Sequence, residues 1–204
     1  MEAAVLSVWA PCSVTGMLRC RNVSGSAMTK PSIYTIGHST HPLEPFIALL
    51  QHVDVNFLVD VRSVPRSRTN PQFNFDSLPK PLAKVNIGYR HIAELGGLRA
   101  HQKAMKESPN GYWTNKSFQN YADYAMGPDF RRGLDALEAL AEKQRCAIMC
   151  AEAVWWRCHR RIIADYLLAE GYPVFHIMGI DKTEAARMTE AAAPAGKRML
   201  RYEG

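Results

Sequence analysis

The sequence lacks any hydrophobic run long enough to form a membrane-spanning helix. Its longest uninterrupted apolar stretch extends only from Cys146 to Ala151, whereas a spanning helix needs roughly 18 or more apolar residues. The 13 glycines and 12 prolines among 204 residues are too few for a low-complexity chain. With 47% hydrophobic and 22% charged residues, the chain is expected to form a globular domain, and global disorder is excluded.

The sequence also lacks the cysteine spacing of a disulfide framework or of a common metal motif. Its five cysteines are an odd number, and neither a Cys-x-x-Cys nor a His-x-x-x-His pair occurs. Three of them, Cys146, Cys150 and Cys158, lie in one short segment. A chain of this length can bury about 70% of its unfolded surface and needs no covalent staple. We therefore expect reduced thiols in a cytoplasmic protein, used for chemistry or for core packing.

The chain has a mildly positive net charge but no continuous run of basic residues. The chain carries 25 Lys and Arg against 19 Asp and Glu, a formal net charge of +6, and no five basic residues follow one another. This balance favours anionic partners without by itself indicating nucleic acid.

The two ends of the chain differ from its middle. Residues 1–27 are basic and poor in acids, and Met28 begins a segment typical of a protein start. We expect residues 1–27 to be a leader outside the fold, either an upstream extension or a transit peptide. Residues 28–180 are expected to form one domain. Residues 181–204 are Ala-rich and charged, and they predict a helix followed by a charged C-terminal tail.

In the middle of the chain, short β-branched and apolar runs alternate with helical patterns. Buried apolar runs predict strands, and apolar residues at helical spacing predict helices, the first of them capped by Thr40. Strands that alternate with helices imply a mostly parallel sheet covered on both faces. The expected fold is α/β, a Rossmann-like three-layer arrangement of about five strands with helices on both faces. The expected strands are 32–37, 56–61, 88–92, 146–150 and 173–178, and the expected helices are 42–52, 78–86, 117–125, 128–143 and 155–170.

Polar and titratable residues follow several of these strands. In open α/β sheets, ligands bind beyond the carboxyl ends of the strands, so residues from separate segments are expected to converge on one pocket. The candidate catalytic residues are Cys150, Glu152, His38 and His159, and the candidate ligand-binding residues are Gly37, Ser39, Asp60, Arg62, Arg157 and Arg160.

Four short motifs follow the predicted strands: Thr35-Ile36-Gly37-His38-Ser39, Asp60-Val61-Arg62, Leu95-Gly96-Gly97, and Cys150-Ala151-Glu152 followed by Cys158-His159-Arg160. Together they resemble the DUF488 family of uncharacterised bacterial and archaeal proteins. The resemblance covers roughly residues 32–180 and implies an α/β fold, without an established reaction. Where many members have a proline between the two halves of the last motif, this chain has Val154-Trp155-Trp156.

Cys150 is the foremost candidate nucleophile. It ends a predicted strand just before a helix, where the helix N-terminus and two arginines would lower the pKa of its thiol. The alternatives are a metal ligand and a small residue of the core. Cys158 and His159 are adjacent on the predicted helix and would point about 100° apart, so Cys158 is expected to pack against the sheet.

Two further candidates also have a structural alternative. His38 could act as a general acid or base, or could hydrogen-bond the start of the following helix. Arg62 could bind an anion through its guanidinium, or could form an internal pair with Asp60.

Three classes of function remain open. The first is an enzyme-like domain that binds a small anion, such as a phosphate or nucleotide, at the strand ends. The second is a non-catalytic nucleic-acid-binding protein that uses Arg62, Arg66, Arg68, Arg90, Arg131 and Arg132. The third is a metal-binding or redox-sensing protein, with zinc or iron held by some of His38, Cys150, Glu152, Cys158, His159 and His176.

Overall fold

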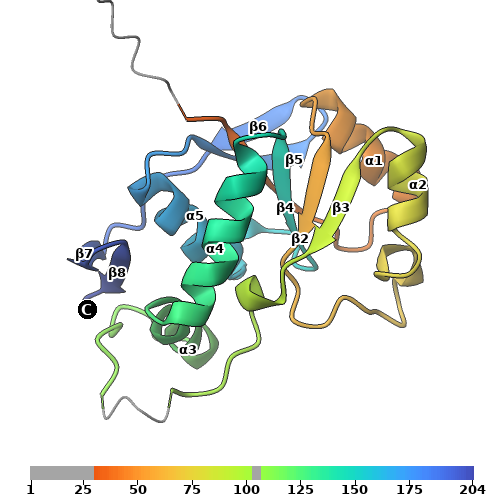
Figure 1. Ribbon diagram of the computed structural model, residues 1–204. Coiled ribbons are helices and arrows are strands. Elements are labelled where there is room, and N and C mark those ends of the chain that lie inside the picture. The colour runs from red at the N-terminus through yellow and green to blue at the C-terminus, as the bar shows by residue number, and fades with distance from the viewer. Residues whose placement is uncertain (1–29, 103–106) are drawn as a thin grey trace, which may run out of the picture.

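The computed structural model describes residues 30–102 and 107–204, so the expected leader, 1–27, lies outside the described residues. The helices are α1 (Leu43–His52), α2 (Pro79–Lys84), α3 (Lys116–Ala125), α4 (Pro128–Ala141) and α5 (Arg160–Ala169) (Figure 1). The strands are β1 (Ile33–Gly37), β2 (Phe57–Asp60), β3 (Gly88–His91), β4 (Cys146–Cys150), β5 (Val174–Gly179), β6 (Lys182–Ala185), β7 (Ala192–Gly196) and β8 (Met199–Tyr202).

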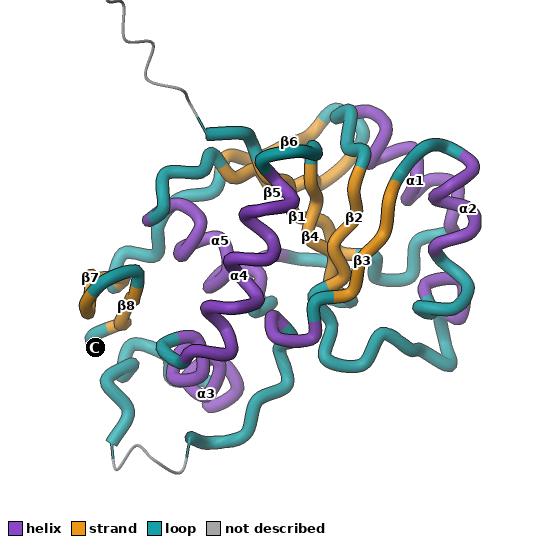
Figure 2. Tube along the Cα trace, viewed as in Figure 1, coloured by secondary structure: helices purple, strands orange, loops and turns teal. Residues whose placement is uncertain are grey.

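A six-stranded sheet forms the middle layer of the domain. Its strand order is β3-β2-β4-β1-β5-β6, and all neighbours pair in parallel except β5 and β6. Helices α1 and α2 cover one face, and α3, α4 and α5 lie on the other (Figure 2). The predicted three-layer α/β fold is confirmed.

Strand β4 shows how the sequence produces the two cores. All of its residues are buried, because side chains alternate between the faces of a strand that is covered on both sides. Cys146, Ile148 and Cys150 belong to the core beneath α3, α4 and α5. Ala147 and Met149 belong to the core beneath α1 and α2. Cys150 therefore points to the α3–α5 side of the sheet.

The expected continuous helix over 155–170 is wrong. Residues Trp155–Arg157 form one 3₁₀ turn, and α5 begins only at Arg160. Between them Cys158 is extended, with φ −128° and ψ 146°. The helical spacing of 100° per residue does not apply across this break, so Cys158 and His159 can direct their side chains to one place.

The expected helix after residue 181 is also wrong. Strand β6 pairs with β5, and β7 and β8 form a separate hairpin in which Leu200 and Tyr202 are buried. Alanine favours a helix locally, but Pro194 and Gly196, which has φ 140°, both oppose one. Burial of the two large side chains then outweighs local propensity.

The ends of α1 and α5 differ in how they are capped. Helix α1 follows Pro42 and has no side-chain cap, so the expected cap by Thr40 is wrong. Gly171 follows the C-terminal end of α5 with φ 83°, a left-handed conformation that suits glycine. Across residues 30–102 and 107–204, no helix combines the length and the apolar character needed to cross a membrane.

The register of the sheet brings three strand ends to one edge. Gly37 of β1 lies beside Cys150 of β4, and Asp60 of β2 lies beside Met149. A side chain at Gly37 would overlap the carbonyl oxygen of Glu152. Glycine is therefore needed here, because the chain that leaves β4 crosses directly over the end of β1.

Candidate functional site

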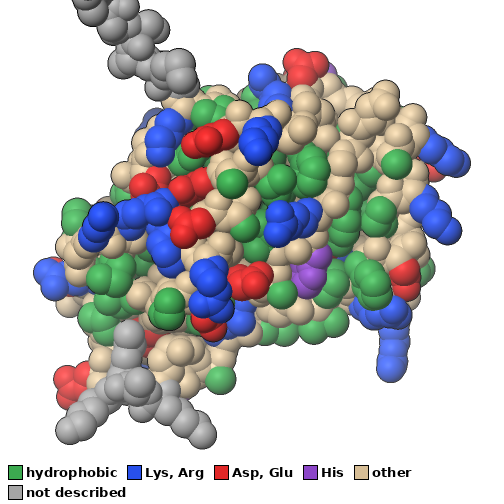
Figure 3. Space-filling model, viewed as in Figure 1, with side chains coloured by type: hydrophobic (Ala, Val, Ile, Leu, Met, Phe, Trp, Pro, Cys, Tyr) green, Lys and Arg blue, Asp and Glu red, His purple; other side chains and the backbone are tan. Residues whose placement is uncertain are grey.

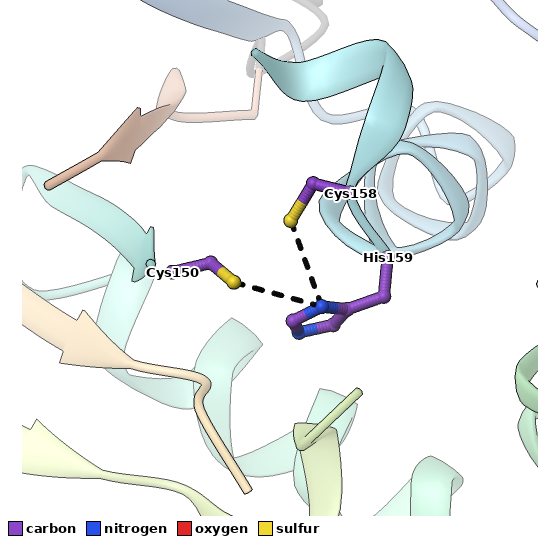
Figure 4. Close-up of side chains that lie close together, drawn as sticks. All are labelled: Cys150, Cys158 and His159. Carbon is purple, nitrogen blue, oxygen red and sulfur yellow. Dashed lines mark hydrogen bonds between the residues drawn. The ribbon is translucent and has the colours of Figure 1, made fainter. Parts of the chain in front are cut away.

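Cys150, Cys158 and His159 form a cluster at this edge of the sheet (Figure 4). The two Sγ atoms and a ring nitrogen of His159 all lie within 4.8 Å of one another. Nδ1 of His159 is 3.7 Å from the sulfur of Cys150 and 3.6 Å from the sulfur of Cys158. The end of β4 supplies the first cysteine, and the extended turn before α5 supplies the other two residues.

The ring of His159 is held by its surroundings. Its Nε2–H donates to the carbonyl of Val61 at 2.9 Å, which directs Nδ1 toward the two sulfur atoms. Tyr121 packs against the ring edge-on, with 5.0 Å between centroids. A Cβ atom at Gly97 would overlap the ring. The ring therefore has one orientation, set by β2, α3 and the loop around Gly97.

Arg160 lies beneath the cluster and is only 1% exposed. Its Nε donates to Cys158 Sγ at 3.3 Å, and its Nη2 donates to the carbonyl of Glu152 at 2.6 Å. Among the described residues no carboxylate pairs with it. A buried cation needs a counter-charge, and the sulfur of Cys158 is the group placed to supply it.

The two thiols of the cluster have opposite pKa shifts. Burial disfavours the Cys158 thiolate, but the thiol of Cys150, His159 and Arg160 together outweigh burial and hold its pKa well below the usual value. The hydrogen bond from Cys150 to Cys158, together with burial, raises the pKa of Cys150. The expected lowering of the Cys150 pKa is therefore wrong, because the hydrogen bond with Cys158 and burial outweigh the positive charge of Arg160.

Asp60, Arg62 and His38 form a second group beside the cluster. Arg62 donates to buried Asp60 through Nε and Nη2, the latter at 2.6 Å, and Tyr89 also donates to this carboxylate. Arg62 Nη1 donates to His38 Nε2 at 3.1 Å, and His38 Nδ1–H donates to the carbonyl of Ser39 at 2.9 Å. Burial lowers the pKa of His38 to about 4, so this histidine is neutral at pH 7 with both ring nitrogens engaged.

A pocket of about 340 Å³ opens over the cluster. Glu152 is the only carboxylate among the described residues that line it, and Val64, Leu98 and Phe118 form an apolar wall. A second cavity of about 330 Å³ adjoins it and shares Arg62, Val64 and Ala151. Of the sequence candidates, the first pocket is lined by Cys150, Glu152, His159, Arg62 and Arg157, and the second by His38, Ser39 and Arg62.

The remaining candidates lie outside both pockets. Asp60 holds Arg62, Arg160 supports the cluster from below, and Gly37 permits the close chain crossing. His176 is also separate from the cluster, since it shares a hydrogen bond with Thr35 and stacks on Trp155. Cys158 packs in the core on the α3–α5 side of the sheet, as expected, and it also lines the pocket beside Cys150 and His159. The signal that could have found it is the adjacent Cys-His pair in the same motif.

Most of the arginines considered for nucleic-acid binding form ion pairs within the protein. Four of the six pair with carboxylates: Arg62 with Asp60, Arg66 with Asp76, Arg132 with Asp129, and Arg131 with three acids. Basic and acidic side chains are interspersed on the face shown in Figure 3. Arg68 and Arg90 are exposed on separate elements.

Residues 42–167, more than half of the chain, match the family described as "Domain of unknown function DUF488". No curated protein and no solved structure matches the chain. The family description carries no activity, so any assignment of function rests on the geometry of the pocket.

Proposed function

Because the chain belongs to the DUF488 family, whose description gives no reaction, we propose its function from the pocket: it is an enzyme that acts on a small anionic substrate. The substrate lies in the pocket over Cys150, Cys158 and His159. Its anionic group is held by Arg157 and Arg62, and its reacting group lies over the cluster.

The observation that carries this proposal is that the cluster and two arginines line the same cavity. Reactive groups and substrate-binding groups must be within reach of one small molecule for catalysis. Groups with strongly shifted pKa values in a cleft are typical of active sites, and Cys158 is such a group.

The charges of the pocket favour an anion. Arg157 is exposed to the pocket, and its guanidinium matches a phosphate or carboxylate in a bidentate way. Arg62 uses its Nε, both hydrogens of Nη2 and one of Nη1 within the protein, which leaves one Nη1–H for a ligand. Arg62 is already paired with buried Asp60, so the groups left to hold an anion are the guanidinium of Arg157 and the remaining Nη1–H of Arg62.

The size of the pocket and its apolar wall further restrict the kind of substrate that can bind. Small-molecule sites usually have volumes of roughly 300–1,000 Å³ and mostly apolar walls with a few convergent polar groups. The pocket is at the lower end of this range. A substrate with one anionic group and a compact apolar or aromatic part fits this lining, and a nucleoside monophosphate is a suitable probe.

Calorimetric titration with inorganic phosphate and with adenosine monophosphate at low salt tests the proposal. The wild-type chain should bind at least one of them, and Arg157→Gln should weaken binding by about tenfold or more, the equivalent of one charge-assisted hydrogen bond. Arg187→Gln is the matched control, since Arg187 is exposed and lies outside both pockets. The proposal is overturned if the wild type binds neither probe, or if both variants lose binding equally.

A further inference from the structure

The geometry points to a zinc site: we propose that Cys150, Cys158 and His159 bind one zinc ion and leave its fourth coordination position open to the pocket. Thiolate sulfur and imidazole nitrogen are the donors that zinc prefers. Catalytic zinc sites use three protein ligands and keep one position for water or substrate, whereas structural sites close all four. Three donors beside an open cavity therefore match the catalytic arrangement.

The distances within the cluster suit a tetrahedral ion. With Zn–S near 2.3 Å and Zn–N near 2.0 Å, tetrahedral angles separate sulfur and nitrogen by about 3.5 Å. Nδ1 of His159 lies 3.7 Å and 3.6 Å from the two sulfur atoms. Only small side-chain movements are needed to bring all three donors onto one ion.

The groups behind the donors are those a metal site requires. Metal-binding histidines nearly always donate their other ring N–H to a carbonyl or carboxylate, which fixes the tautomer. His159 does so to Val61 through Nε2, and this leaves Nδ1 for the ion. Arg160 donates to Cys158 Sγ from the side of the core. An N–H donor to a ligand sulfur favours the deprotonated form that metal binding needs.

The two cysteines of the cluster are buried, but all three donors line the pocket. Cys150 and Cys158 are 6% and 2% exposed, yet both line the pocket together with His159. The ion would therefore be shielded by the sheet and α5 on one side and accessible on the other. No carboxylate belongs to this cluster among the residues that the structure describes.

The charge balance indicates what would fill the open position. Zn²⁺ and two thiolates are together neutral, and buried Arg160 adds one positive charge with no carboxylate partner among the described residues. A bound hydroxide or an anionic substrate group would neutralise the centre. A zinc site with this balance favours the ionised form of its bound water.

The reaction class that follows is hydrolysis, and this part rests on the proposed function. The oxygen of the zinc-bound water forms a bond to the electrophilic atom of the substrate, and the bond to the leaving group breaks. One proton of the water stays on the new hydroxyl group, and the other goes to the leaving group. Water is the only co-reactant.

Metal analysis of the full chain, purified without chelators or a metal-affinity tag, tests the site. We expect close to one zinc per chain, as isolated or after zinc addition and desalting. Cobalt substitution should give thiolate-to-cobalt charge-transfer absorption and the intense visible bands of a tetrahedral ion. An empty site, a Cys150–Cys158 disulfide, or iron in place of zinc each overturns the proposal.

Variants identify the ligands. Cys150→Ala, Cys158→Ala and His159→Gln should each lose most of the bound metal, whereas Cys146→Ala should retain it. Cys146 is the matched control because it is a buried cysteine of the same strand outside the cluster. An equal loss of metal in the Cys146→Ala control contradicts the site. If a ligand variant fails to fold, the cobalt spectrum of the wild type tests the site in its place. Arg157→Gln should keep its zinc, so failure of anion binding and failure of metal binding are distinguishable.

Discussion

The Nε atom of Arg160 lies 3.3 Å from the sulfur of Cys158, and neither residue is more than 2% exposed. A guanidinium at this depth has lost its hydration and must be compensated by the protein. The sulfur, the Glu152 carbonyl and the Thr35 hydroxyl are its partners. The cation that supports the site is therefore also part of what holds β1, the loop after β4 and α5 together.

Replacing Arg160 by methionine should destabilise the domain. The change leaves the carbonyl of Glu152 without its donor and removes the counter-charge of Cys158, and an unsatisfied buried group costs about 1–3 kcal/mol. Urea unfolding should show a decrease in the free energy of unfolding that lies within or above this range. Arg157→Met is the control, because Arg157 is exposed and should change stability by no more than about 0.5 kcal/mol. Equal effects of the two changes would contradict the role given to Arg160.

Gly97→Ala should disturb the site more than the fold. The added methyl group overlaps the ring of His159, which must turn away from Val61 and from the two sulfurs. Loss of such a supporting contact typically costs 10–100-fold in metal affinity, and overpacking costs about 1–3 kcal/mol. Cobalt titration followed by absorption measures the first effect. In Gly111→Ala the nearest atom would be 3.8 Å away, so this variant should bind cobalt like the wild type.

The stability of the chain should fall between pH 6.5 and pH 4. Burial lowers the pKa of both His38 and His176 from 6.5 to about 4, so the unfolded chain binds more protons than the folded chain in this window. The two histidines therefore stabilise the fold fully above pH 6.5, and this contribution is lost as the pH falls through 4. Each can contribute at most about 3 kcal/mol.

Urea unfolding at several pH values measures this dependence. His38→Gln should be less stable than the wild type at pH 7 and should show a shallower decline toward pH 4. A decline as steep as that of the wild type would show that His38 does not titrate in this way. His41→Gln serves as the control, because His41 is exposed.

Tyr202→Phe should destabilise the domain through Asp165. The Tyr202 hydroxyl donates to this buried carboxylate at 3.0 Å, next to the backbone N–H of Thr189 at 2.8 Å. Removing the hydroxyl donor from this buried carboxylate costs about 1–2 kcal/mol, which thermal unfolding can detect. Arg201→Ala alters an exposed neighbour of the same strand and should have little effect. If Tyr202→Phe also leaves the stability unchanged, the hydrogen bond between Tyr202 and Asp165 contributes little to the stability of the domain.

The central strands β1, β2 and β4 could be predicted from the sequence because they are buried on both faces and are therefore nearly all apolar, whereas the exposed, charged edge strand β6 was not predicted. The convergence of polar residues on one edge followed from the parallel topology alone. The sequence could not show how Cys158 and His159 lie, because their relation depends on one extended residue before α5. A continuous helix through Cys158 would point the side chains of Cys158 and His159 in different directions.

The C-terminal strands were missed for a different reason. Alanine-rich sequence favours a helix in isolation, and what decides against it is the burial of Leu200 and Tyr202 against distant parts of the chain. Likewise, nothing local to Arg62 shows that His38 and the Phe73 carbonyl would engage its guanidinium. Contacts between residues far apart in the sequence cannot be predicted from the spacing of residue types along the chain.

The order of the sheet leaves β3 and β6 as its two edges. Each has only four residues, and Arg90 and Lys182 project as exposed charges from them. Short charged edges discourage the pairing of one sheet with that of a second molecule, the route by which open sheets aggregate. Although the sheet is open at both edges, we therefore expect it to resist the addition of strands from neighbouring chains at high concentration.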